Sequence, residues 1–237
     1  MEKIELLVVG AGGTGTYFLK EVARYLAAKK EKSPVTQVVV MDGDTVELKN
    51  LSRQAFQEED IGRNKAEAIT EAINDVYGLS FMYIPEYLTK LDQLNAVFSN
   101  KYKTVPVIIS CVDNHAARLL LEEYFDKHKN CILYDSGNEY ETGEVVFANK
   151  VNGQVISPVR SVYFPDIKTG DLRSVEEMSC EELNNAAPQH IFTNMCAGLA
   201  LLSAFSDLMD EKPVCGMTMF NPRALSMEFF PYQQKEA

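Results

Sequence analysis

Gly10-Ala11-Gly12-Gly13-Thr14-Gly15 follows a continuous apolar run over residues 4–9 and precedes a helical pattern over residues 16–29. Glycines between a buried strand and a helix let the backbone approach a pyrophosphate, and the free N–H groups of the helix start then point at it. The four glycines therefore predict a nucleotide-binding turn in an α/β fold, and they are Gly10, Gly12, Gly13 and Gly15. A tight structural turn is the plainer alternative, and glycines alone do not say which nucleotide is bound.

Residues 42–54 (DGDTVELKNLSRQ) begin where the next apolar strand pattern, residues 38–41, ends. An acidic residue at such a strand end is typical of a ribose contact, so we expect Asp42 to bind ribose hydroxyls. Asp44 either contacts the substrate or holds the turn, since Asp-Gly-Asp is common in turns. Three further polar residues follow, namely Asn50, Arg53 and Gln54. A site that stabilises charge on reacting phosphates needs such a set, whereas hydride transfer does not.

Apolar runs and helical patterns alternate through the first half of the chain. We expect strands over residues 4–9, 38–41, 79–84, 105–110 and 131–136, and helices over residues 16–29, 62–77, 91–98 and 114–128. This alternation predicts a doubly wound α/β fold, Rossmann-like, with a mainly parallel sheet and right-handed crossovers.

The pattern changes towards the C-terminus. Residues 144–150 and 154–157 flank a turn signal and predict a hairpin, and two more strands are expected over 214–220 and 224–230. Residues 165–188 are polar and read as a long loop, and residues 190–209 form the most hydrophobic helix. These added strands predict antiparallel pairing. No linker divides the sequence, so we expect a single domain over residues 1–237.

Composition narrows the function classes. The chain has 23 Lys and Arg against 34 Asp and Glu, a formal net charge of −11, which argues against wide contact with nucleic acid or anionic membrane. No apolar run approaches the ~20 residues of a membrane span, and no signal-peptide pattern precedes the first strand. The five cysteines are odd in number and form no CxxC pair, which favours a reducing compartment, and we expect a cytoplasmic protein.

Two further motifs follow in order: Gly62-Arg63-Asn64-Lys65, and Ser110-Cys111-Val112-Asp113-Asn114 with Arg118 after it. Together with the two stretches above, they resemble the ThiF–MoeB–HesA superfamily of ubiquitin-activating-enzyme-like adenylyltransferases. The resemblance covers the first half of the chain, and more loosely it is similar to stand-alone ThiF-like proteins encoded on plasmids or in operons. It implies ATP·Mg²⁺-dependent adenylation of the C-terminal carboxylate of a small ubiquitin-like or sulfur-carrier protein with a free C-terminal glycine, releasing pyrophosphate.

In the family the matching positions contact ATP, so the resemblance assigns phosphate handling to Asn50, Arg53, Gln54 and Lys65. Arginine suits bidentate contact with phosphate oxygens, and preorganised cations stabilise charge on the reacting phosphates. We expect Arg53 and Lys65 to be catalytic, although each alone would more simply face solvent. Arg63 lies close by, but the resemblance gives it no role.

Asp113 follows the predicted strand over residues 105–110, and ligands of open α/β sheets gather at the carboxyl ends of strands. Mg²⁺ is commonly held by one or two carboxylates together with phosphate oxygens and water. We therefore expect Asp113 to bind Mg²⁺ and to act in catalysis. Asn114 is a candidate cap for the next helix.

Cys180 lies in the polar loop, where many relatives carry a cysteine, and the resemblance makes it a candidate for covalent chemistry after adenylation. Glu181 and Glu182 would raise rather than lower the pKa of its thiol. The other four cysteines, Cys111, Cys131, Cys196 and Cys215, lie in apolar runs and read as small buried hydrophobes. Many relatives bind zinc through two CxxC pairs; this sequence has none, so zinc is not expected.

Two alternatives stay open. An NAD(P)-dependent oxidoreductase would use the same glycines. A non-catalytic nucleotide-binding partner protein would keep the fold and ATP without turnover. Some relatives supply an arginine to the partner subunit's ATP site from residues before the first strand, where this sequence has Met1, Glu2 and Lys3. Relatives pair through apolar surfaces, and the hydrophobic helix over residues 190–209 offers one, so we expect a homodimer.

Overall fold

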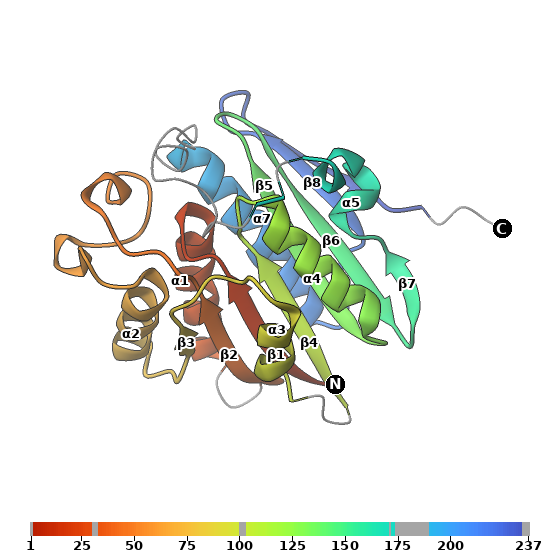
Figure 1. The fold of residues 1–237 in the computed structure, drawn as a ribbon, viewed down its shortest axis with the longest axis horizontal. Coiled ribbons are helices and arrows are strands. Elements are labelled where there is room, and N and C mark those ends of the chain that lie inside the picture. The colour runs from red at the N-terminus through yellow and green to blue at the C-terminus, as the bar shows by residue number, and fades with distance from the viewer. Residues whose placement is uncertain (1, 30–32, 100–102, 171, 174–189, 234–237) are drawn as a thin grey trace.

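The computed structural model describes residues 2–29, 33–99, 103–170, 172–173 and 190–233 (Figure 1). Within them, nine strands form one sheet in the order β3-β2-β1-β4-β5-β6-β8-β9, with β7 paired to β6. The parallel strands are β1 (Lys3–Val9), β2 (Val35–Met41), β3 (Met82–Ile84), β4 (Thr104–Ser110) and β5 (Cys131–Asn138). The antiparallel strands are β6 (Gly143–Val151), β7 (Gln154–Ser157), β8 (Gly216–Asn221) and β9 (Ser226–Pro231). The predicted fold class, a parallel core with antiparallel strands added, is confirmed.

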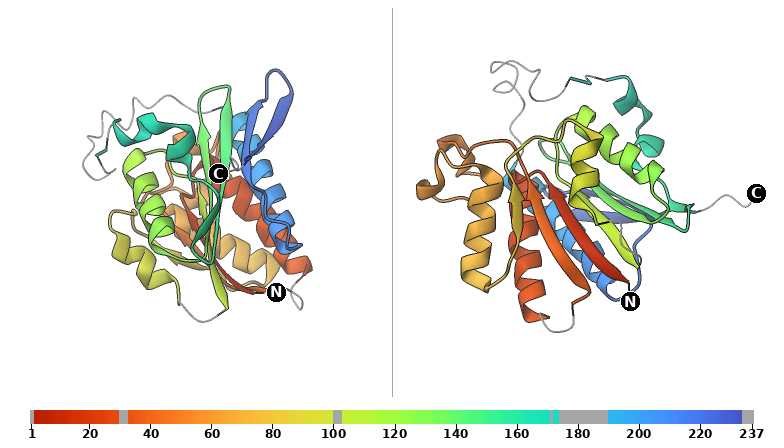
Figure 2. Two further views of the ribbon diagram at one scale, coloured as in Figure 1. Left: turned by 90° about the vertical axis from the view of Figure 1, so that its right-hand side faces the viewer. Right: turned by 60° about the horizontal axis from the view of Figure 1, so that its bottom comes forward.

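The helices are α1 (Gly13–Ala28), α2 (Lys65–Tyr77), α3 (Leu91–Val97), α4 (His115–Lys127), α5 (Arg160–Tyr163) and α7 (Ile191–Met209). The 3-10 turns of the described residues are η1 (Leu48–Asn50), η2 (Glu58–Asp60) and η3 (Pro165–Lys168). Helices α1, α2 and α7 cover one face of the sheet, and α3 and α4 cover the other (Figure 2).

This sandwich explains why the strands read as unbroken apolar runs. In β1, Leu6 and Val8 pack into the core on the side of α1 and α7, while Leu7 and Val9 pack on the side of α3 and α4. A strand covered on both faces has no solvent side for polar residues to occupy.

Element boundaries differ from the predicted ones for local reasons. The strand expected to begin at residue 79 begins at Met82, because the side chain of Asn74 on α2 binds both the N–H and the carbonyl of Phe81, at 2.8 and 2.9 Å. The predicted hairpin turn is confirmed: Asn152 and Gly153 both have positive φ, as a type I′ turn requires. Helix α5 was not predicted, since four residues carry no periodic pattern.

Helix α7 corrects one expectation. By length and composition it is able to cross a membrane, contrary to the prediction that no apolar run approaches that length, and half of its apolar window is buried inside the structure. It packs closely on α1, because a Cβ on Gly198 would lie 3.1 Å from the Tyr17 Cβ. Its Thr193 and Asn194 are fully buried. These contacts are those of a core helix in a layered fold.

Candidate functional site

A cavity of about 950 Å³ opens at the carboxyl ends of the parallel strands. It lies between the parallel strands β1 and β4, where the order in which successive strands are added to the sheet reverses. Open α/β sheets bind their ligands at this position. The predicted site residues that line it are Gly10, Gly12, Gly13, Asp42, Asp44, Asn50, Arg53, Gln54, Lys65 and Asp113. Gly15 is not among the lining residues, and Cys180 lies outside the described residues.

The glycines of the first turn have separate reasons to be glycine. Gly10 has φ +95°, and a Cβ there would lie 2.6 Å from the carbonyl oxygen of Cys111 on the loop after β4. A Cβ on Gly13 would lie 2.0 Å from Nδ2 of Asn194, and one on Gly15 would lie 2.0 Å from the Gly10 carbonyl oxygen. Gly12 alone has space, since its Cβ would meet only Gln54 Nε2 at 3.8 Å. Close packing therefore requires three of the glycines, and the cavity borders the fourth.

Asp42 holds the turn to which it belongs. Its carboxylate accepts hydrogen bonds from the backbone N–H groups of Ala11, at 2.5 Å, and Asp44, at 2.8 Å. Burial raises the pKa of Asp42 to about 6, against the opposing charge of Lys65. Asp42 thus links the glycine turn to the second site loop while its carboxylate borders the cavity.

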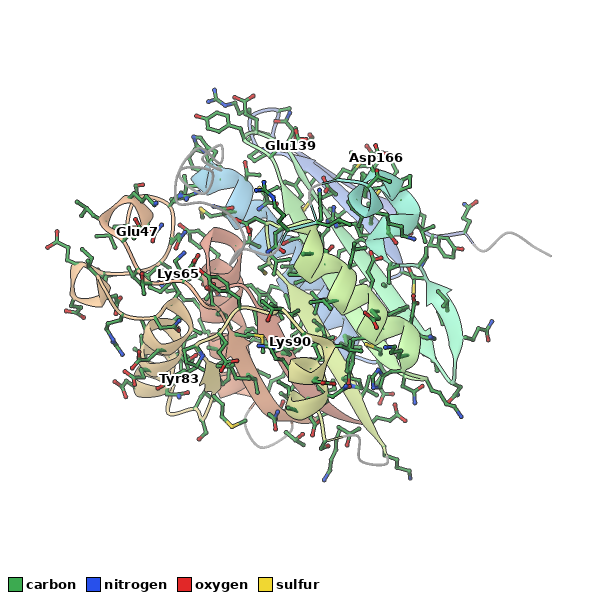
Figure 3. All side chains as sticks on the ribbon, viewed as in Figure 1. Glu47, Lys65, Tyr83, Lys90, Glu139 and Asp166 are labelled. Atoms are coloured by element: carbon green, nitrogen blue, oxygen red, sulfur yellow. The ribbon has the colours of Figure 1, made fainter. Side chains whose placement is uncertain are left out.

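Asp44 is held from two sides. Lys65 Nζ lies 2.8 Å from Asp44 Oδ2, and the Tyr87 hydroxyl donates a hydrogen bond to Oδ1. Burial would raise the pKa of Asp44, but Lys65 and the two hydrogen bonds outweigh it and hold that pKa below its usual value. Lys65 itself is buried, at 6% exposed, although Lys normally faces solvent. Figure 3 labels Lys65 and, nearby, Glu47 of the loop that leads into η1.

Asn64 joins this loop to α2. Its side-chain oxygen caps the helix by accepting from the Glu67 N–H at 3.1 Å, as the N-cap preference for Asn predicts. Its side-chain nitrogen donates to the carbonyls of Asp42, at 2.8 Å, and Asp44, at 3.1 Å. The start of α2, and with it Lys65, is therefore tied to the backbone of both site aspartates.

Another part of the cavity lining consists of Asn50, Arg53 and Gln54. Asn50 is buried, and its Oδ1 accepts from the Glu47 N–H at 2.9 Å, which fixes η1. Among the described residues, the Arg53 guanidinium has no ion pair or hydrogen bond. Arg63 instead pairs with Glu67 and Glu71 of α2 and with Asp60 of η2, and it does not line the cavity. Of these two neighbouring arginines, only Arg53 offers the cavity an uncommitted cation.

Asp113 projects into the cavity from the loop after β4, and no partner of its side chain lies among the described residues. Its charge, with those of Asp44 and Asp42, adds to burial and the Asp44 hydrogen bond in raising the pKa of Tyr87. A carboxylate without a protein partner beside the glycine turn has the chemistry of a Mg²⁺ ligand, because Mg²⁺ takes few protein ligands. The described residues hold no cluster of three or more His, Cys, Asp or Glu side chains that could bind a metal ion. Asn114 caps α4 through the Ala117 N–H, at 2.8 Å, as expected.

Several lining residues were missed from sequence. Tyr87 follows β3, and its ring occupies the space beside Gly43, where a Cβ would lie 2.5 Å from the Tyr87 Cγ. Ser136, Asn138 and Tyr140 follow or end β5. The rule that applied to Asp113, that ligands gather at carboxyl ends of parallel strands, would have found both groups.

Cys111 also lines the cavity, but burial raises the pKa of its thiol to about 12. A thiol with that pKa stays protonated and is a weak nucleophile at neutral pH. The prediction that the four cysteines are buried holds for Cys131, whereas Cys111, Cys196 and Cys215 are only partly buried.

The ThiF family model matches residues 1–236. The NEDD8-activating enzyme E1 catalytic subunit of Dictyostelium discoideum is 38% identical over 218 residues, which are 88% of this chain and 45% of that protein. The adenylyltransferase and sulfurtransferase MOCS3-1 of Zea mays is 31% identical over 125 residues, 52% of this chain and 24% of that protein. The chain spans between about a quarter and half of the length of such relatives.

Solved structures agree on the fold. The crystal structure of E. coli MccB with ATP superposes with a TM-score of 0.67 at 16% identity, covering 96% of this chain and 63% of that one. PaaA gives the same TM-score at 16% identity over 97% of this chain and 64% of its own. Because the family model matches nearly every residue and the site motifs line one cavity at the expected edge of the sheet, the chain belongs to the ThiF family.

Proposed function

We propose that the chain binds ATP and Mg²⁺ and adenylates the C-terminal carboxylate of a small ubiquitin-like or sulfur-carrier protein, releasing pyrophosphate. The observation that carries the proposal is a free Arg53 guanidinium in the same cavity as Asp113, beside the glycine turn at the start of α1. In this reaction a carboxylate oxygen of the partner attacks the α-phosphorus, a new oxygen–phosphorus bond forms, and the bond to the β-phosphate breaks.

Each of the chain's own groups has a distinct task in that reaction. The N–H groups at the start of α1 face the phosphates, and Asp42 accepts from ribose hydroxyls. Arg53 and Lys65 stabilise charge on the α-phosphate and on the departing pyrophosphate, with Asn50 and Gln54 beside them. Asp113 is the residue that would hold Mg²⁺, which when bound neutralises charge on phosphate oxygens. No general base is needed, because the attacking carboxylate is already ionised.

The named activities of the relatives support this proposal. These relatives include an adenylyltransferase and sulfurtransferase, a NEDD8-activating enzyme, and MccB, which has been solved with ATP and with MccA. We further propose a reducing, cytoplasmic location, which the four free cysteines of the described residues support.

The test is ATP–pyrophosphate exchange with a candidate carrier protein, comparing Arg53→Ala with Arg63→Ala. Losing one preorganised cation typically lowers the rate about 10²–10³-fold, which we expect for Arg53→Ala. We expect an equal fall for Asp113→Ala, because Asp113 is the residue that would hold the Mg²⁺ cation. Arg63→Ala removes an arginine ten positions away that pairs with Asp60, Glu67 and Glu71 and does not line the cavity, and it should keep its exchange rate.

Near-normal exchange by a folded Arg53→Ala protein would remove the proposed role. Titration of the purified chain with ATP and with NADH separates an adenylyltransferase from an oxidoreductase. Tight ATP binding without exchange, across candidate carriers, would instead support a non-catalytic nucleotide-binding partner protein.

A further inference from the structure

Behind the cavity wall, four charged side chains from four elements meet in what we term the charged cluster: Arg118 of α4, Asp135 of β5, Glu144 of β6 and Arg160 of α5. Arg118, Asp135 and Arg160 are each less than a tenth exposed. Two cations face two anions, so the cluster is neutral as a whole. None of the four lines the cavity, yet the cluster reaches the loop that does.

A continuous path of hydrogen bonds runs from the cluster to the site loop. Arg160 Nε donates to Asp135 Oδ2 at 2.6 Å, and Arg160 Nη2 donates to the Asp135 carbonyl at 2.9 Å. Asp135 Oδ1 accepts from Arg118 Nη1, and Arg118 Nη2 donates to the carbonyl oxygen of Val112 at 2.6 Å. The Val112 carbonyl shares a planar peptide unit with the nitrogen of Asp113. Holding that carbonyl therefore fixes the plane from which the Asp113 side chain projects.

Part of the charged cluster lies beside Gly137, which has no side chain to fill that space. A Cβ on Gly137 would lie 2.4 Å from Glu144 Oε1 and 2.7 Å from Arg160 Nη1, so only glycine fits beside the pair. The Arg160 guanidinium also lies over the Phe164 ring, 5.3 Å from its centroid. The buried Arg160 guanidinium is thus held by several partners, which is what a positioning residue needs.

The geometry points to Arg160 as a positioning residue for Asp113: through Asp135 and Arg118 it fixes the Val112–Asp113 peptide and so determines how Asp113 meets the metal-bound nucleotide. This inference rests on the proposed function. It places a determinant of the nucleotide site on α5, after the antiparallel hairpin and far in sequence from every nucleotide-binding motif.

The test is Arg160→Lys, which keeps a cation next to Asp135 but removes the planar fork that bonds Asp135 and Glu144 together. The control is Arg223→Lys, which alters an exposed arginine paired with Glu141 and away from the cluster. Isothermal titration measures ATP affinity with and without Mg²⁺. The readout is the gain in ATP affinity that Mg²⁺ provides, taken as the ratio of the two values. We expect Arg160→Lys to lower that gain about tenfold, with metal-free ATP affinity unchanged and Arg223→Lys like the wild type.

Coupling to Asp113 is tested by a double-mutant cycle. If Arg160 acts through Asp113, adding Arg160→Lys to Asp113→Asn should lower the gain no further, because the second change acts on an interaction already lost. Additive losses would overturn the inference, as would a full Mg²⁺ gain in Arg160→Lys or an equal fall in metal-free affinity. Should Arg160→Lys not fold, Glu144→Gln replaces it, since it removes the negative charge that pairs with Arg160 Nη1 while keeping the side-chain shape.

The two proposals fail differently. A wild-type chain that neither binds ATP nor exchanges pyrophosphate would refute the proposed function. Exchange that depends on Asp113 while Arg160→Lys behaves like Arg223→Lys would leave that function standing and reject the positioning role.

Discussion

At the scale of single side chains, the Asp42 carboxylate is held by several contacts in the site. It receives two backbone N–H groups, lies against Lys65 and Asp44, and has its pKa raised to about 6 by burial. A carboxylate that titrates this close to neutrality gives the nucleotide site a pH dependence that ordinary aspartates lack.

We predict that ATP affinity falls as pH falls through about 6, by up to about tenfold per pH unit, because protonated Asp42 loses acceptor capacity for the ribose hydroxyls. Stability should move the opposite way. Since the folded pKa lies above the unfolded value, the native state binds the proton more tightly, and the contribution of Asp42 to the free energy of unfolding is lost as pH rises through about 6.

Titration calorimetry over pH 5–8 measures the affinity, and 2′,3′-dideoxyATP is the control, because it has the same phosphates but no ribose hydroxyls. Parallel pH profiles for ATP and the dideoxy analogue would show that Asp42 does not bind the ribose.

A further prediction concerns Cys180, whose surroundings lie outside the described residues. Adenylation should not require its thiol, because the carboxylate of the partner attacks the α-phosphate and a cysteine acts only afterwards, as acceptor of the acyl group. Cys180→Ala should retain pyrophosphate exchange. A role for the thiol would appear only as a missing thiol-sensitive adduct in intact-mass measurements, and loss of exchange in a folded variant would contradict the prediction.

At the level of elements, the turn between β1 and α1 combines two requirements in adjacent residues. Gly13 has no room for a Cβ because α7 presses Asn194 against it, while Gly12 borders the cavity and has room. Both glycines therefore border the cavity, but only Gly13 is also a packing position.

Gly13→Ala should therefore lower the free energy of unfolding by about 1–3 kcal/mol through overpacking against α7. Gly12→Ala should change stability by about 1 kcal/mol at most, the usual effect of Ala at an N-cap, and should instead weaken ATP binding by narrowing the approach to the helix start. Denaturant unfolding and ATP titration on both variants measure the two effects. A larger loss of unfolding free energy in Gly12→Ala than in Gly13→Ala would show that Gly12, not Gly13, is the packing position.

The same elements show what can be predicted from sequence. The strands and long helices were found because β1, β2 and β4 are buried on both faces and α1 and α2 have apolar stripes. The site residues just after β1, β2 and β4 were found because they follow those runs closely. The charged cluster was invisible, because its members come from four elements and no local spacing relates them. Tyr87 was missed because the strand-end rule was applied only after β1, β2 and β4, although Tyr87 closely follows β3.

For the molecule as one body, α7 has an unusual outer surface. Its exposed side includes Phe192, Met195 and Leu199, at 57%, 46% and 59% exposed, on a helix whose opposite side is core. Apolar side chains that recur at such spacing on one helix face favour a partner surface over solvent.

We predict a homodimer with about twice the 26.6 kDa chain mass in light scattering. Leu199→Asp should weaken it by placing a charge on the α7 face. Leu225→Asp should not, since Leu225 is 94% exposed at the β8–β9 turn. A wild-type mass near 26.6 kDa at micromolar concentration would contradict the prediction.

The order of strands also determines when each edge of the sheet closes during synthesis. β1 pairs with β2 on one side and with β4 on the other, and β4 ends at Ser110. At about 5–20 residues per second, the ribosome completes β4 roughly 5–20 s after β1. Until then the backbone N–H and C=O groups on that edge of β1 lack their native partner strand, and they can pair with a wrong one. The nucleotide site, which lies at the junction of β1 and β4, therefore assembles only when this vulnerable interval ends.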